Sequence, residues 1–199
     1  MLIIYPQHRT IYIYIYIYIK YLYLRNNKLS TFPTRVIFIN LIFMDLSYNK
    51  FTNYRFLKHV PLLKHLHLNH NKFDAFHGLR MSNTLETLSV GYNKIQNFIN
   101  LPRFPKLKVL SLVNNNITSF KGYPFFEKLE ILDLRFNPIS NRPLFFEIAL
   151  SLSNPITLFK LNGKYLTDKD WEKAKKLRGK LSLAIRNGFW PSKSDTALE

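Results

Sequence analysis

The chain has 199 residues, 47% of them hydrophobic and 21% charged, a composition typical of one folded domain with a sizeable core. It contains no cysteine, which excludes disulfide bonds and thiolate metal sites. The formal net charge of +17 has two interpretations. One is an acidic partner, such as nucleic acid, an anionic membrane or an acidic protein surface. The other is codon usage, because Ile, Tyr, Phe, Asn and Lys, all with AT-rich codons, are abundant.

The first segment, residues 1–18, is of low complexity. Ile and Tyr alternate over residues 11–19, as in a translated TA repeat. Such a stretch has high β propensity, but it is shorter than the ~20 apolar residues that a membrane span needs. No small-residue cleavage site follows it, so we expect no signal peptide. We interpret residues 1–18 as the product of a misplaced start codon or an expanded repeat, without a function.

Residues 19–142 contain six copies of a 22-residue pattern. The third copy reads Leu-x-x-Leu-x-Leu-x-x-Asn-x-Phe-x-x-Phe over residues 63–76. Its asparagine recurs without insertion, at Asn27, Asn49, Asn71, Asn93, Asn115 and Asn137. A fixed period of this length is typical of a solenoid, in which each coil packs against its neighbours.

Each position of the pattern has a structural role. The Leu-x-Leu pair places two side chains on one face of a short strand, pointing into the coil. The next apolar residue and the later Phe or Tyr fill the same core. The asparagine stands at the bend, where its amide can satisfy backbone groups that have left the strand. We therefore predict a ladder of six stacked asparagines, which builds the fold and carries no chemistry.

This pattern resembles the leucine-rich-repeat superfamily, in its intracellular 22-residue class, which includes the regulatory leucine-rich subunit of protein phosphatase 1 and the spliceosomal A-prime protein. The resemblance implies an α/β fold: a right-handed solenoid with a concave parallel β-sheet, short 3₁₀ or irregular convex turns and a helical C-terminal cap. Extracellular members usually have disulfide-bonded caps. Because this chain has no cysteine, we expect it in the cytoplasm, with the nucleus as the alternative.

Residues 143–180 are predicted to cap the last coil. Pro143 can open a helix that runs over 144–152, an apolar edge strand is predicted over 156–161, and Asn162-Gly163 forms a turn. Thr167 can then start a second helix over 168–177, with acidic residues near its positive end. This arrangement looks like the cap of the A-prime and dynein-light-chain-like families.

Residues 181–199 form a tail. Its stretch 183–190 (Leu-Ala-Ile-Arg-Asn-Gly-Phe-Trp), together with the turn at 120–124 (Phe-Lys-Gly-Tyr-Pro), is similar to the repeat region of a family of microtubule-associated proteins first named for auxin induction in root cultures. In that family the repeats precede a long array of immunoglobulin-like modules, so the resemblance implies that the chain is truncated.

Side chains between the leucines are expected to point out of the concave sheet, where a partner can reach them. Tyr and Phe there are favoured anchors, because they bury much area at little entropic cost. The alternative is that strand positions tolerate aromatics without any partner. Gly91 should leave a gap that a partner side chain could enter. The predicted partner-binding residues are Tyr21, Tyr23, Phe43, Asp45, Tyr48, His65, His67, His70, Ser89, Tyr92, Ser111, Asp133 and Arg135.

Three histidines gather in the third repeat, and Asp45 should lie one strand spacing, ~4.8 Å, from His67. We predict no metal there, because a zinc site needs three or four ligands in a closed shell. We interpret Asp45 and His67 as a surface pair that makes binding pH-sensitive, and Asp133 and Arg135 as an ion pair.

We expect no enzyme activity and no cofactor. The chain has no phosphate-cradling glycine loop and no cysteine nucleophile, and a flat open face does not exclude water from a set such as His67, Ser89 and Asp45.

The sequence favours a non-catalytic scaffold that binds another protein on its concave face, as part of a microtubule- or cytoskeleton-associated protein. The partner would have an acidic surface such as tubulin, and we expect a monomer without a nucleic-acid partner, since no nucleic-acid motif accompanies the charge. A phosphatase 1 regulatory-type subunit and a ribonucleoprotein component like the A-prime protein remain alternatives.

Overall fold

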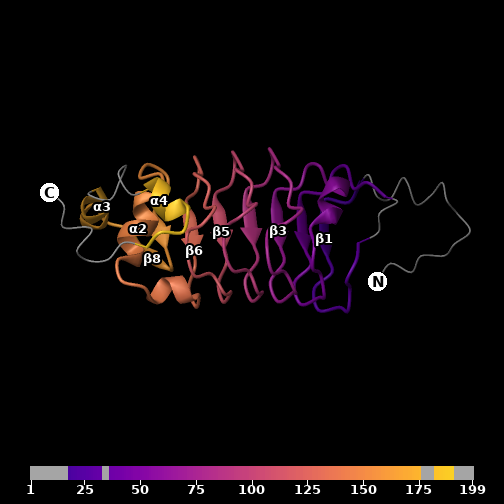
Figure 1. The fold of residues 1–199 in the computed structure, drawn as a ribbon. Helices are drawn as coiled ribbons and strands as arrows, with labels where there is room; N and C mark the ends of the chain where they lie inside the picture. Colours follow the sequence, from indigo (N-terminus) through magenta and orange to yellow (C-terminus); the bar gives the residue numbers. More distant parts are fainter. Residues whose placement is uncertain (1–17, 33–35, 176–181, 191–199) are drawn as a thin grey trace, which may run out of the picture.

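Six short parallel strands, one per repeat, lie side by side in chain order and form most of the eight-stranded sheet of an elongated solenoid (Figure 1). The computed structural model describes residues 18–32, 36–175 and 182–190. Consecutive strands pair in the register of the repeat, so that Leu66 lies opposite Leu88. The six strands are β1 (Tyr21–Tyr23), β2 (Phe43–Asp45), β3 (His65–His67), β4 (Thr87–Ser89), β5 (Val109–Ser111) and β6 (Ile131–Asp133). The sequence prediction of a parallel-sheet solenoid is confirmed.

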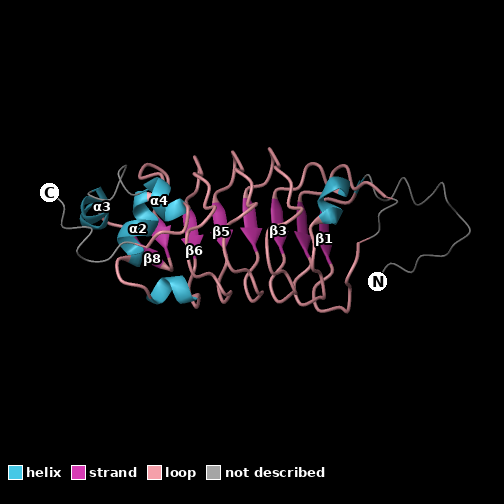
Figure 2. Ribbon diagram, viewed as in Figure 1, coloured by secondary structure: helices cyan, strands magenta, loops and turns pink. Residues whose placement is uncertain are grey.

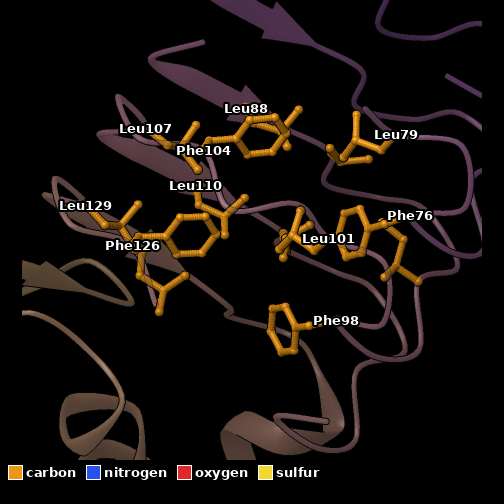
Figure 3. Close-up of a cluster of buried hydrophobic side chains, with 14 of the residues drawn as sticks. Phe76, Leu79, Leu88, Phe98, Leu101, Phe104, Leu107, Leu110, Phe126 and Leu129 are labelled. Carbon is orange, nitrogen blue, oxygen red and sulfur yellow. The ribbon is translucent and has the colours of Figure 1, made fainter. Parts of the chain in front are cut away.

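The other side of the solenoid consists mainly of loops and turns (Figure 2). The 3₁₀ helix η1 (Arg55–His59) lies in the second coil. Between the two sides, the leucines and phenylalanines of successive coils form one continuous core, in which Phe76 and Phe98 come from neighbouring coils (Figure 3). Full burial of each such side chain contributes about 1.5–3 kcal/mol, so stacking of the coils is the main source of stability.

The repeated asparagines connect each coil to the one before it. Asn71 Nδ2 donates to the carbonyl of Leu68 in its own coil (3.1 Å) and to that of Leu46 in the preceding coil (3.0 Å). Its Oδ1 accepts the backbone N–H of Phe51 (2.9 Å). The same three bonds recur one repeat apart at Asn49, Asn93, Asn115 and Asn137. Asn27 is exposed and donates within its own coil, to Leu24 and Arg25.

The residue before each of these asparagines has a left-handed backbone. Its φ lies between 53° and 58° in all six coils, at Asn26, Tyr48, His70, Tyr92, Asn114 and Phe136. Residues other than glycine rarely adopt this conformation, and aromatic ones less often than asparagine. The bend therefore turns one side chain per coil to the same flank of the sheet.

The last coil is followed by the 3₁₀ helix η2 (Pro138–Asn141), the helix α2 (Phe145–Ser151), two strands and two further helices. The strands are β7 (Lys160–Leu161) and β8 (Lys164–Tyr165), and the helices are α3 (Asp168–Lys175) and α4 (Ser182–Arg186). Helix α2 begins one residue later than predicted, because Leu144 is left-handed with φ 61°. The last two residues of the helix predicted over 168–177 lie outside the described residues.

The prediction of an edge strand over 156–161 is wrong. Asn154 starts a turn there: its Oδ1 accepts the N–H of Ile156 (3.0 Å) and its carbonyl that of Leu158 (3.0 Å). Only Lys160–Leu161 is strand, paired in parallel with β6 and antiparallel with β8, so β8 is the edge.

Helix α4 and the residues after it pack on the solenoid at the turn 120–124. The carbonyl of Arg186 accepts the backbone N–H of Gly122 (2.8 Å). The ring of Trp190 is stacked on Phe120, with centroids 6.4 Å apart, and the guanidinium of Arg142 lies over Trp190. The two stretches that carry the microtubule-family resemblance are therefore in contact with each other.

Candidate protein-binding surface

The first and last side chains of strands β1–β6 point away from the core, and we call this surface the sheet face. Tyr21 and Tyr23 are the most open, at 61% and 66% exposed. Most others are half-buried, because neighbouring side chains one strand away lean on them. The sheet face comprises Tyr21, Tyr23, Phe43, Asp45, His65, His67, Thr87, Ser89, Val109, Ser111, Ile131 and Asp133.

Aromatic rings gather around Phe43 at the N-terminal half of the sheet face. Its ring centroid is 5.0 Å from that of Tyr23 and 5.2 Å from that of His67. Tyr21 and His65 lie slightly farther away, at 6.5 and 6.4 Å. These residues come from three adjacent strands, and together they make a continuous aromatic surface of the kind that anchors protein partners.

The predicted surface pair of Asp45 and His67 is wrong. Asp45 is only 8% exposed, and its Oδ1 accepts the backbone N–H of Ser47 at 2.8 Å. The carboxylate thus stabilises its own turn, although its charge still favours the protonated imidazole. Burial outweighs that effect and lowers the pKa of His67 below its usual value. His67 is therefore neutral at pH 7.

Gly91 lines an open hollow, but the space directly beside its Cα is already filled. Asn69 Oδ1 accepts the backbone N–H of Gly91 (2.7 Å) and the hydroxyl of Ser89 (2.9 Å). A Cβ at Gly91 would approach that oxygen and the Val113 carbonyl to 3.0 Å. The amide of Asn69 occupies the space that the missing side chain seemed to leave.

A second aromatic group borders the sheet face on the flank created by the left-handed residues. Tyr48 and His70 are stacked with ring centroids 4.0 Å apart, and His70 and Tyr92 follow at 4.1 Å. The Arg25 guanidinium covers the outer face of Tyr48, 4.5 Å from the ring centre. We call Arg25, Tyr48, His70 and Tyr92 the aromatic stack. Burial, followed by the charge of Arg25, lowers the pKa of His70, so the stack carries one positive charge at neutral pH.

A shallow hollow of about 320 Å³ separates the aromatic stack from the C-terminal half of the sheet face. Its floor includes Ser89, Gly91 and Ser111. At its far end Arg135 forms a short ion pair with Asp133, with Nη2 and Oδ2 2.6 Å apart. Hydroxyl groups and a paired guanidinium in an open hollow suit hydrogen bonding to a polypeptide.

Ser89, Asp45 and His67 form no catalytic set. The Ser89 hydroxyl donates to Asn69, and the Asp45 carboxylate accepts from the backbone N–H of Ser47 rather than from His67. No group of three or more His, Asp or Glu side chains that could hold a metal ion occurs among the described residues. Within the same ranges, no helix is long and apolar enough to cross a membrane.

Residues 105–144 match the sequence model of a family described as leucine rich repeats, in two copies. They cover the fifth repeat, with β5, and the sixth, with β6, the same 22-residue frame that recurs through the four coils before them. The matched residues are thus leucine-rich repeats, and the described coils together have the leucine-rich-repeat fold. A search of curated proteins finds no match.

Leucine-rich-repeat solenoids are typically non-catalytic scaffolds that bind other proteins. The sequence predicts Tyr48, His70 and Tyr92 in the binding surface, but not their stacking or the contribution of Arg25. The signal was present, because these residues are 22 apart and each directly precedes a ladder asparagine.

Proposed function

We propose that this leucine-rich-repeat protein is a scaffold whose sheet face and aromatic stack dock a partner protein. The observation that carries the proposal is the pair of aromatic groups, one around Phe43 and one running from Arg25 to Tyr92, on the same rigid solenoid. Rings already held by their neighbours lose little conformational entropy when a partner covers them.

The test is an affinity pull-down that compares two triple variants. Tyr23→Ala, Tyr48→Ala and His67→Ala together remove exposed or half-buried rings from the proposed surface. Exposed apolar residues outside that surface supply the matched control: Leu62→Ala, Met81→Ala and Ile99→Ala. The first variant is expected to lose its partners and the second to keep them. Retention of the same partners by the first variant would show that the surface is wrongly assigned.

For the cellular role, we propose a cytoplasmic, cytoskeleton-associated protein that acts as a monomer, with an acidic surface such as tubulin as the partner. The net charge of +17 and the resemblance of 120–124 and 183–190 to a microtubule-associated family support this role. Co-sedimentation with microtubules that weakens with added salt is expected. Co-purification of a phosphatase catalytic subunit would instead favour the phosphatase alternative, and nuclease-sensitive co-purification would favour the ribonucleoprotein alternative.

A further inference from the structure

Four lysines form a column on the flank of the solenoid. Each directly follows a ladder asparagine, so they are 22 residues apart, and all four are exposed. The backbone N–H of Lys72 bonds to the Phe51 carbonyl of the preceding coil (2.9 Å), and that of Lys94 to the Phe73 carbonyl (2.7 Å). Their side chains therefore start about one strand spacing apart, ~4.8 Å. We call Lys28, Lys50, Lys72 and Lys94 the lysine column.

A second set of charged residues shows what neutralisation looks like in this protein. The residues directly before successive strands form another column. In it Glu86 lies between Lys64 and Lys108, and the distances from the two Nζ atoms to its carboxylate are 3.4 and 3.6 Å. The column of lysines has no such carboxylate, since the corresponding residues of the fifth and sixth coils are Asn116 and Pro138. Among the described residues, none of its four lysines forms an ion pair, and the nearest acidic residue along the chain is Asp74.

The lysine column runs beside the aromatic stack. In the second, third and fourth coils the lysine is two residues after the stacked ring, and the asparagine between them points inward, whereas Lys28 of the first coil is three residues after Arg25. Both faces of His70 are covered by Tyr48 and Tyr92, and one face of Tyr48 by Arg25. A partner therefore meets ring edges, which carry the positive end of the aromatic quadrupole.

We propose that the lysine column and the aromatic stack bind an extended acidic segment of the partner protein. The inference rests on the proposed scaffold function and specifies the chemistry of what is bound. Carboxylates on one side of an extended chain recur every ~6.8 Å, and four lysines with flexible stems cover about 14 Å along the solenoid. Two or three glutamates or aspartates can thus each reach an ammonium group.

A single-stranded nucleic acid fits this surface less well. Such ligands gain much of their affinity from bases that stack on free aromatic faces. Here the rings stack on one another, so phosphates would meet the lysines while the bases found few open ring faces. The geometry favours carboxylates on a polypeptide.

The experiment measures binding of a fluorescent peptide of ten glutamates to the whole chain by fluorescence anisotropy. A decaglutamine peptide and a single-stranded RNA of the same charge serve as comparison ligands. The test variant replaces Lys28, Lys50, Lys72 and Lys94 by Gln. The matched control replaces Lys20, Lys58, Lys106 and Lys128 by Gln, which lowers the net charge equally at exposed residues outside the column. Circular dichroism checks that both variants fold.

The column variant is expected to bind the glutamate peptide about tenfold more weakly, since each exposed ion pair contributes a factor of about two. The control is expected to change by less than about twofold, and added salt should weaken binding of the unmodified chain. Equal losses in both variants, or tighter binding of the RNA than of the peptide, would overturn the proposal.

A third variant separates this inference from the docking of a partner on the sheet face. Tyr23→Ala with His67→Ala alters the sheet face and leaves the lysine column and the aromatic stack intact. It is expected to bind the glutamate peptide like the unmodified chain, even where it fails to retrieve partners. Loss of peptide binding in this variant would place the acidic segment on the sheet face and contradict the assignment.

Discussion

In each coil from the second to the sixth, a single asparagine amide satisfies backbone groups in two coils. Asn115 donates to the carbonyls of Leu112 and Val90 and accepts the N–H of Ile95. The side chain is 4% exposed, so water cannot replace these bonds easily. Leaving buried backbone groups without partners costs about 1–3 kcal/mol each.

We expect Asn115→Ala to lower the free energy of unfolding by about 2–4 kcal/mol, because several buried carbonyls and one amide lose their partner together. Urea denaturation followed by circular dichroism measures the change. The neighbouring exposed Asn116→Ala is the control and should stay within about 0.5 kcal/mol of the unmodified chain. Similar midpoints for the two variants would contradict the structural role of the ladder.

At the scale of elements, the junction between α4 and the turn 120–124 depends on a glycine. Gly122 has φ 79°, and a Cβ there would come within 2.7 Å of the backbone of Ile99. Backbone atoms cannot move aside as a flexible side chain does. The same glycine donates its N–H to the carbonyl of Arg186, so a shift of this turn also disturbs α4.

Gly122→Ala is therefore expected to destabilise the protein by at least about 2 kcal/mol more than Gly78→Ala. Gly78 has a similar φ of 82°, but a Cβ there meets nothing within 4 Å, so this control isolates backbone strain from steric overlap. Tryptophan fluorescence during urea unfolding is a suitable probe, because Trp190 lies against Phe120. Equal destabilisation by the two substitutions would show that the junction tolerates a methyl group.

The sequence predicts the elements of the solenoid well and the details of its surface less well. Leucine spacing determines which residues enter the core, so the strands and their register follow from the 22-residue frame. The conformation of Asp45 depends instead on its hydrogen bond with a backbone amide two residues away. The space beside Gly91 depends on the rotamer of Asn69. The turn at Asn154 shortened the predicted strand in the same way, since local side-chain bonds outweighed apolar content.

At the scale of the whole molecule, the net charge of +17 opposes folding through self-repulsion. The ion pairs of the solenoid involve a minority of its cations, and the lysine column places four ammonium groups on adjacent coils. Repulsion between exposed charges is screened over a Debye length of ~10 Å at 0.1 M salt.

Raising NaCl from about 20 mM to about 200 mM should therefore raise the midpoint of thermal unfolding, although salt weakens the few ion pairs. Circular dichroism at several salt concentrations measures this shift. The variant with Gln at the four lysines of the column should show a higher midpoint at low salt and a smaller shift. A midpoint that falls as salt is added would mean that attractive pairs outweigh the repulsion.

The ladder asparagines also determine how such a chain can change its length during evolution. Every inter-coil bond of Asn71 joins residues 20 or 25 positions apart, and the bonds of the other coils have the same separations. Duplication or loss of a whole 22-residue unit recreates each of these bonds at the new junction. Insertion of one residue within the strand or the bend moves the bonded groups of that coil out of position, so changes in chain length are expected to add or remove entire coils or to fall in the outer loops.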